Sequence, residues 1–162
     1  MKNKALIYLC CLFFMPYIYS ADNLRPLEYQ GYEFINGLPI NFNQYKGKIV
    51  YIDFWASWCA PCVKSLPFME KLHHQFPTDK FKIIAINIDE DKESANTFLK
   101  DHPISYLNLY DPKGLIGKKL KVRNMPTAFL IDQDGNVLFK HSGFNEKYAK
   151  KLEQVLDKLI QN

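Results

Sequence analysis

Two nearly continuous apolar runs constrain the fold of this chain more than any other feature of its sequence. They are KIVYIDFWA (48–56) and FKIIAINI (81–88), and both are rich in β-branched residues. Such runs are typical of strands that are covered on both faces, as in a parallel sheet. Between them, apolar residues recur at helical spacing, at Val63, Leu66, Met69, Leu72 and Phe76. The sequence therefore predicts a strand–helix–strand unit, and Pro67 is expected to kink the helix.

The order of the remaining elements defines the fold class. Residues 92–100 and 113–121 are predicted to be helical, with a short strand at 104–109 between them. TAFLID and VLFKH flank the turn sequence QDGN and predict two antiparallel strands, at 127–132 and 137–141. An apolar stripe then predicts a closing helix, with Asn145 as its N-cap. This order predicts an α/β fold, a three-layer α/β/α sandwich.

The first twenty residues have the pattern of a secretory leader. Lys2 and Lys4 precede a mainly apolar stretch, and Ser20 and Ala21 supply the small residues of a cleavage site. We therefore predict a signal peptide at 1–20 and export to the periplasm or cell envelope. The alternative is an uncleaved membrane anchor, although the apolar stretch is short for a helix that crosses a bilayer.

Two further segments precede the first long apolar run. Residues 21–31 are expected to form a loose N-terminal arm. YEFINGLPINF (32–42) predicts a β-hairpin with Asn36-Gly37 as its turn, added at the edge of the sheet. The domain itself is expected to span 32–162.

Cysteine usage restricts the chemistry to one pair of residues. Cys10 and Cys11 lie in the leader, which leaves Cys59 and Cys62 of WASWCAPC. A structural zinc site needs four ligands, and the histidines of the chain are scattered, at His73, His74, His102 and His141. A purely structural disulfide between residues three positions apart would restrain little chain entropy. The sequence favours a redox pair over both alternatives, and no metal is predicted.

The position of the pair assigns a role to each cysteine. Cys59 follows an apolar strand and opens a predicted helix, where unpaired N–H groups and the helix dipole favour a thiolate. Pro61 is expected in the first turn, where its missing N–H costs little. Cys62 lies one turn further on and is expected to be more buried. We therefore predict that Cys59 attacks and that Cys62 resolves.

Taken together, these motifs resemble the thioredoxin superfamily. YIDFWASWCAPC, Pro67 in the following helix, MPTAFLID and a late SGF carry the resemblance, which covers roughly residues 32–160. The predicted hairpin and the segment YKGKIVYIDFWASWCAPC are most similar to the exported branch of TlpA, ResA and CcmG, the last a reductase of cytochrome c maturation.

The resemblance implies a substrate-binding surface around the cysteines. Pro126 matches the cis-proline of the superfamily, which would hold the backbone of Met125 opposite Cys59 so that a substrate segment can pair as an added strand. Trp58 is expected to pack near the cysteines and shape the site. The expected substrate-binding residues are Trp58, Ala60, Pro61, Met125, Pro126 and Thr127.

Two acidic residues are further candidates for catalysis. Asp53 lies within an apolar strand, where desolvation would raise the pKa of its carboxyl. Thioredoxins of the cytoplasm carry a buried aspartate here that is thought to exchange a proton with the resolving cysteine, whereas many exported relatives do not. The alternative is an Asp at the edge of the sheet that contacts water or a lysine. Glu90 aligns loosely with an acidic residue that ResA-like proteins place near the active site, but the run Asp89 to Asp91 also suits a helix N-terminus.

The predicted reaction is thiol–disulfide exchange without a bound cofactor beyond the Cys59–Cys62 disulfide. Expected partners are protein disulfides or dithiols, with apocytochrome c as an implied substrate, and a membrane thiol protein as electron donor. Outside the leader the chain has nearly balanced charge, which argues against nucleic acid as a partner. We expect a monomer.

The sequence leaves several alternative functions open. The same residues could oxidise or isomerise disulfides, although Ala60-Pro61 resembles the reductive relatives. A peroxiredoxin would need a Thr two or three positions before its cysteine, which ASWCAPC lacks. A Sco-like copper protein would need wider cysteine spacing and a distal histidine, for which His141 is the candidate. Insulin reduction, peroxide consumption and Cu(I) uptake respectively would distinguish the three classes.

Overall fold

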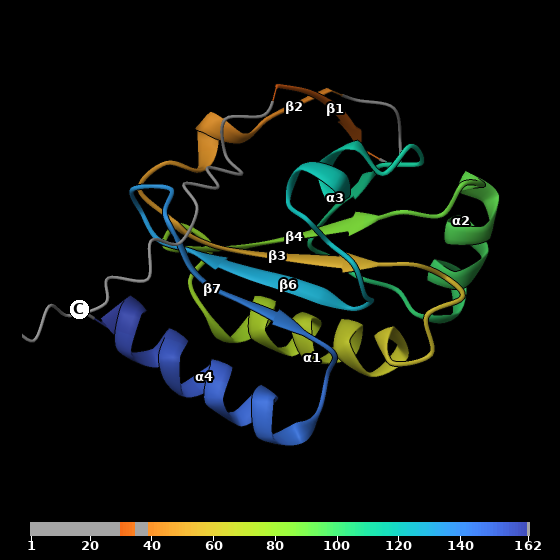
Figure 1. Cartoon of the computed structure of the whole chain (residues 1–162). Coiled ribbons are helices and arrows are strands. Elements are labelled where there is room, and N and C mark those ends of the chain that lie inside the picture. The colour runs from red at the N-terminus through yellow and green to blue at the C-terminus, as the bar shows by residue number, and fades with distance from the viewer. Residues whose placement is uncertain (1–29, 35–38, 162) are drawn as a thin grey trace, which may run out of the picture.

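The computed structural model describes residues 30–34 and 39–161, which form a seven-stranded sheet with helices on both faces (Figure 1). The strand order is β2-β1-β5-β4-β3-β6-β7. The strands are β1 (Gln30–Phe34), β2 (Pro39–Asn41), β3 (Ile49–Trp55), β4 (Phe81–Asn87), β5 (Leu107–Tyr110), β6 (Thr127–Ile131) and β7 (Val137–Ser142). The helices are α1 (Cys62–Gln75), α2 (Lys92–Asp101), α3 (Leu115–Lys119) and α4 (Glu146–Gln161), with a short 3-10 helix at Phe42–Tyr45.

The two apolar runs form the centre of the sheet, as predicted. β3 and β4 pair in parallel, with Ile49 opposite Phe81 and Trp55 opposite Asn87. Every residue of β3 is buried, as is every residue of β4 except the half-buried Lys82. β5 continues the parallel arrangement, and β6 and β7 close the other side in antiparallel pairing.

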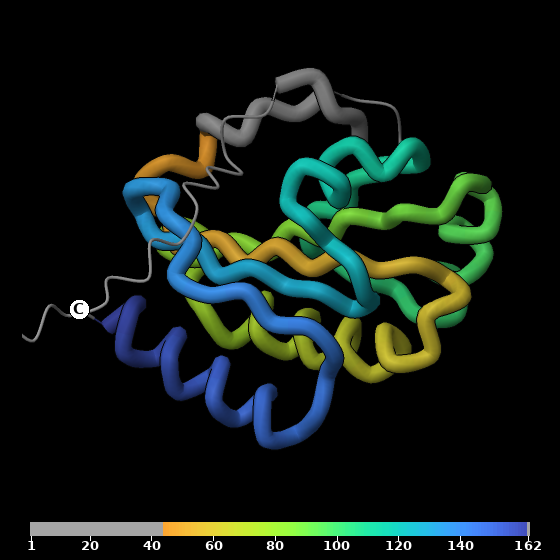
Figure 2. Tube along the Cα trace, in the orientation of Figure 1, coloured from red at the N-terminus to blue at the C-terminus, as the bar shows by residue number. Residues whose placement is uncertain are grey.

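The sheet divides the core into two halves, each covered by helices, which confirms the three-layer sandwich. α1 and α4 run beneath the sheet and α3 lies above it (Figures 1 and 2). On the α1 and α4 side, Tyr51 and Trp55 pack with Leu66 and Leu152, and on the α3 side Ile52 and Phe54 pack with Ile116 and Leu120. Successive side chains of β3 point to opposite faces of the sheet, so Asp53 lies on the α1 side together with Tyr51 and Trp55.

The predicted hairpin is present at one edge of the sheet. β1 pairs antiparallel with β2 on one side and with β5 on the other. Its predicted turn, Asn36-Gly37, lies outside the described residues, as do the leader at 1–20 and most of the N-terminal arm. β1 begins at Gln30, two residues before the predicted start of the hairpin.

Element boundaries differ from expectation at α1, β5 and α3. α1 begins at Cys62 with Pro61 as its N-cap residue, so Cys59 lies in the turn before the helix and Pro61 precedes its first turn. A proline has no N–H to donate, and its carbonyl accepts the bonds from Lys64 N and Ser65 N that start the helix. β5 begins three residues later than expected, and α3 is shorter than 113–121 at both ends. Among the described residues, no helix is long and apolar enough to span a bilayer.

Candidate active site

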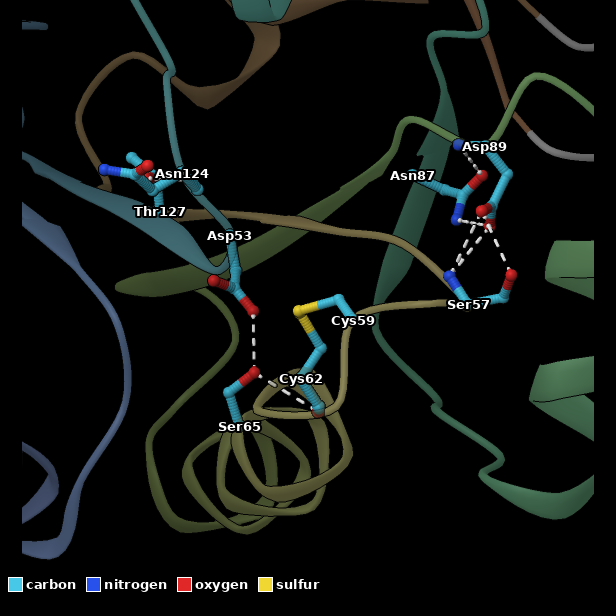
Figure 3. Close-up of a disulfide and its surroundings, with 9 residues drawn as sticks. All are labelled: Asp53, Ser57, Cys59, Cys62, Ser65, Asn87, Asp89, Asn124 and Thr127. Atoms are coloured by element: carbon cyan, nitrogen blue, oxygen red, sulfur yellow. Dashed lines mark hydrogen bonds between the residues drawn. A yellow bond between two sulfur atoms is a disulfide. The ribbon is translucent and has the colours of Figure 1, made fainter.

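Cys59 and Cys62 form a disulfide where β3 leads into α1, with Cys59 in the turn after the strand and Cys62 as the first residue of the helix (Figure 3). Their Cα atoms are 5.4 Å apart. The turn that carries them is closed by hydrogen bonds from Cys59 N to the carbonyl of Ala56 (3.0 Å) and from Cys62 N to the carbonyl of Cys59 (2.9 Å). Cys62 is fully buried and Cys59 is 4% exposed, so Cys59 is the sulfur nearer to the surface.

The two tryptophans of the motif occupy opposite environments. Trp55 is buried, donates from Nε1 to Asn108 Oδ1 at 3.0 Å and packs against Phe98, so it belongs to the core. Trp58 is 67% exposed, and Ala60, Pro61 and Val63 next to it are exposed as well. Trp58 was predicted to pack near the cysteines, whereas in the structure its side chain is exposed to solvent. An exposed apolar surface of this kind is typical of an interaction site.

The loop that contains Pro126 ends at the same edge of the sheet. The Met125–Pro126 peptide bond is cis. Thr127 begins β6 opposite Phe54 of β3, so the loop before it is next to the end of β3 that leads to the cysteines. The Thr127 hydroxyl donates to the carbonyl of Asn124 at 2.6 Å and lies 3.0 Å from Ser142 Oγ, and Pro126 O accepts from Gly143 N. The side chain of Thr127 therefore secures the loop.

Asp53 is a buried carboxyl group beside the disulfide. It is 1% exposed, and burial raises the pKa of its side chain to about 8, an effect that a hydrogen bond from Ser65 partly offsets. β3 is a central strand, so the edge-of-sheet alternative for Asp53 is wrong. The tyrosines that share its electrostatic environment are Tyr51, Tyr106 and Tyr148.

Ser65 connects Asp53 to the resolving cysteine. Its Oγ lies 3.4 Å from Asp53 Oδ2 and 3.3 Å from the carbonyl oxygen of Cys62. A hydroxyl has one proton to donate, so these two acceptors share it. Sequence reasoning missed Ser65, although a spacing of three residues from Cys62 places both on one helix face.

The acidic run after β4 divides into three different roles. Asp91 caps α2, where its side chain accepts from the backbone N–H groups of Glu93 and Ser94. The side chain of Glu90 is exposed, and its carbonyl accepts from the Tyr110 hydroxyl at 2.9 Å. The structure gives Glu90 no bond to the disulfide loop, whereas Asp89 is buried and bonds to Ser57 of that loop. Within this run it is therefore Asp89 that contacts the disulfide loop, and the catalytic role of Glu90 stays a prediction.

The described residues contain no group of three His, Cys, Asp or Glu side chains that could hold a metal ion. His141, the distal histidine of the copper alternative, lies in β7 opposite Ala128. Its ring stacks on Tyr148, with the ring centroids 3.5 Å apart. This stacking gives His141 a packing role at the sheet edge.

A sheet of this order, with a CxxC disulfide where β3 leads into α1, defines a thioredoxin-like thiol–disulfide oxidoreductase. The chain belongs to the Redoxin family, which it matches over residues 36–156. Thiol-disulfide oxidoreductase ResA of Bacillus thuringiensis is 34% identical over 125 residues, which cover 77% of this chain and 71% of the relative.

Solved structures agree with this assignment. A protein of Chlorobium tepidum assigned as a thiol:disulfide interchange protein DsbE superposes with a TM-score of 0.76 at 34% identity, covering 82% of this chain and 92% of that one. The exposed lipoprotein thioredoxin of Streptococcus pneumoniae superposes with a TM-score of 0.64 at 30% identity, covering 81% and 98%.

Proposed function

We propose that this chain is an exported reductase of protein disulfides in the cell envelope, with cytochrome c precursors among its substrates. The observation that carries the proposal is the pairing of a nearly buried disulfide with an exposed apolar surface at Trp58. A surface of this kind suits a protein segment as substrate. The likeness to a thioredoxin named as an exposed lipoprotein supports action outside the cytoplasm.

The proposed reaction begins with the reduced protein. The Cys59 thiolate attacks one sulfur of a substrate disulfide, and the other substrate sulfur leaves as a thiolate. Cys62 then loses its proton and attacks Cys59 Sγ, which releases the second substrate thiolate and forms the Cys59–Cys62 disulfide. A dithiol protein of the membrane would return two electrons and complete the cycle.

Asp53 is the proposed base for Cys62. Its pKa of about 8 is close to the ordinary thiol pKa of about 8.5, so proton transfer between the two groups is nearly balanced in free energy. Ser65 contacts both Asp53 and the carbonyl of Cys62, and so fixes the carboxyl relative to the start of α1. No metal or organic cofactor takes part in these steps.

A trapping experiment tests the substrate class. Cys62→Ala leaves Cys59 able to attack but removes the residue that resolves the mixed disulfide, so substrates should stay covalently attached. The variant is expressed in the native host with its leader, and the attached proteins are identified by mass spectrometry after thiol-specific elution. Cytochrome c precursors in the eluate would support the proposal.

The control is Cys59→Ala/Cys62→Ala, which can trap nothing. If the variant traps a broad set of other envelope proteins, the function is general disulfide reduction and not cytochrome maturation. Traps confined to proteins that are normally reduced would indicate an oxidase instead. If the purified chain does not reduce insulin with dithiothreitol as the electron source, the proposed reductase activity itself is wrong.

A further inference from the structure

We propose that Asp89 is a positioning residue for exchange at Cys59. Through Ser57 it fixes the loop that carries the attacking cysteine, and so stabilises the disulfide form of the protein. The inference rests on thiol–disulfide exchange by Cys59 and Cys62, and it holds for either direction of the reaction.

The contacts of Asp89 are made by donors from two adjacent segments. Ser57 N lies 2.9 Å from Oδ2 and 3.2 Å from Oδ1, and Ser57 Oγ donates to Oδ1 at 3.0 Å. From β4, Asn87 Nδ2 donates to Oδ2 at 2.7 Å, and Asn87 Oδ1 accepts from Asp89 N. In the view of Figure 3 this cluster lies on one side of the disulfide, and Asp53 with Ser65 lies on the other.

These contacts favour a carboxylate at position 89. Every group that points at the side chain is a donor, and an ionised carboxyl has acceptors alone. Asparagine has nearly the same shape, but in either orientation its NH₂ group would face the backbone N–H of Ser57, which can only donate. Asp89 is 2% exposed, so water cannot readily replace a lost partner.

Asp89 acts where the loop leaves the sheet. Trp55 O still accepts from Ile88 N as part of the strand end, and Cys59 N already bonds to Ala56 O. Ser57 lies between these two points and is tied to β4 by the carboxylate. These Asp89–Ser57 hydrogen bonds, here called the brace, therefore hold Cys59 near Cys62 before the sulfurs join. As a result, less chain entropy is lost when the disulfide closes.

This argument gives the sign of the effect. Without the brace, the dithiol form gains freedom that the disulfide form cannot use, and the equilibrium moves toward the dithiol. Loss of the negative charge acts in the same direction, since a carboxylate bonded to Ser57, two residues before Cys59, disfavours a thiolate there. Asp89→Asn should therefore make the protein easier to reduce.

The experiment measures the equilibrium constant between reduced protein and oxidised glutathione. Asp89→Asn should lower the equilibrium constant for forming the disulfide about tenfold, the effect of losing one charged hydrogen bond. The matched control is Asp111→Asn, because Asp111 is also a buried carboxylate, and it accepts from the N–H groups of Leu115, Ile116 and Gly117, away from the cysteines. Asp111→Asn should lose stability yet keep the parental constant within about twofold.

A milder pair of variants covers the case in which Asp89→Asn does not fold. Ser57→Ala removes one hydroxyl bond to Asp89, and Ser94→Ala removes an equivalent 3.0 Å bond to Asp91 in the exposed cap of α2. Ser57→Ala should lower the constant two- to threefold, and Ser94→Ala should leave it unchanged. The inference fails if folded Asp89→Asn, or Ser57→Ala in its place, keeps the parental constant while the parent exchanges normally. A parent that does not exchange with glutathione would instead overturn the activity on which the inference rests.

Discussion

Asp53 is the residue on which the proton chemistry of the second step depends. The carboxyl must be ionised to accept the proton of Cys62, and its pKa of about 8 means that this fraction increases between neutral and mildly alkaline pH. In Asp53→Asn the base is absent. We expect release of substrate from the mixed disulfide to slow about a hundredfold at pH 8, the lower end of the range for general base catalysis. Stopped-flow measurement of single-turnover release from a small aromatic disulfide checks this.

Ser65→Ala distinguishes this role from a purely structural one. The Ser65 hydroxyl lowers the pKa of Asp53, so its loss should move the midpoint of the pH–rate profile upward. Asp111→Asn serves as the control for loss of a buried carboxyl elsewhere. Parental rates and an unchanged profile in both Asp53→Asn and Ser65→Ala would show that Asp53 is not the base.

At this scale the sequence identified some functional residues and missed others for physical reasons. Cys59, Cys62 and Asp53 stand out because a thiol pair and a lone carboxyl are unusual around an apolar strand. Ser65 and Asp89 carry no such signal, since a serine in a helix and an aspartate in an acidic loop are ordinary. Their roles depend on burial and on partners 12 and 32 positions away, which the folded chain alone brings together.

At the scale of elements, the N-cap of α4 illustrates what a local pattern can establish. Asn145 was predicted as the cap, and its Oδ1 accepts from Tyr148 N at 2.9 Å. Asn145→Ala should therefore lower the free energy of unfolding by about 1 kcal/mol. Urea denaturation of the oxidised protein measures the loss, and Asn145→Ser, which can still cap, should retain most of the stability. Equal losses in the two variants would mean that the side-chain bond is not what stabilises the helix start.

Helix and strand positions followed from periodicity, while their ends did not. The start of α1 was misplaced because Pro61 suits both the first turn and the position before it, and the choice depends on which carbonyl begins the helical bonds. The early start of β1 has a similar cause. Gln30 has no strand signal of its own, and it joins the sheet because Asn41 of β2 pairs with it.

At the scale of the whole molecule, strand direction explains why the site is assembled at one edge of the sheet. β3 and β4 are parallel, so the loop with Cys59 and the loop with Asp89 leave the sheet together. β6 is antiparallel to β3, so its first residue, Thr127, and the preceding Pro126 lie at that same edge. Three segments distant in sequence thus meet around the disulfide because of topology, and α1 supplies Ser65.

The burial of Asp53 also predicts how the stability of the whole molecule depends on pH. The ordinary pKa of this carboxyl is 3.8, and in the folded protein it is about 8. Between these values the folded state keeps a proton that the unfolded state releases. The contribution of Asp53 to stability is therefore fully present below pH 3.8 and is lost as the pH rises toward 8, by at most about 1.4 kcal/mol per pH unit.

Other groups titrate with the opposite sign, so the measurement must isolate Asp53. Hydrogen bonds lower the pKa values of Asp91 and Glu153, and burial lowers those of His73 and His141. Burial raises the pKa of Glu70, but its hydrogen bonds outweigh that effect and lower the pKa overall. All five groups therefore favour the folded state as the pH rises. Urea unfolding of the oxidised parent and of Asp53→Asn at pH 5, 6, 7 and 8 separates the two effects. The difference in free energy between variant and parent should grow in favour of Asp53→Asn with each step. A constant difference across this range would mean that the carboxyl of Asp53 is already ionised in the folded protein at pH 5.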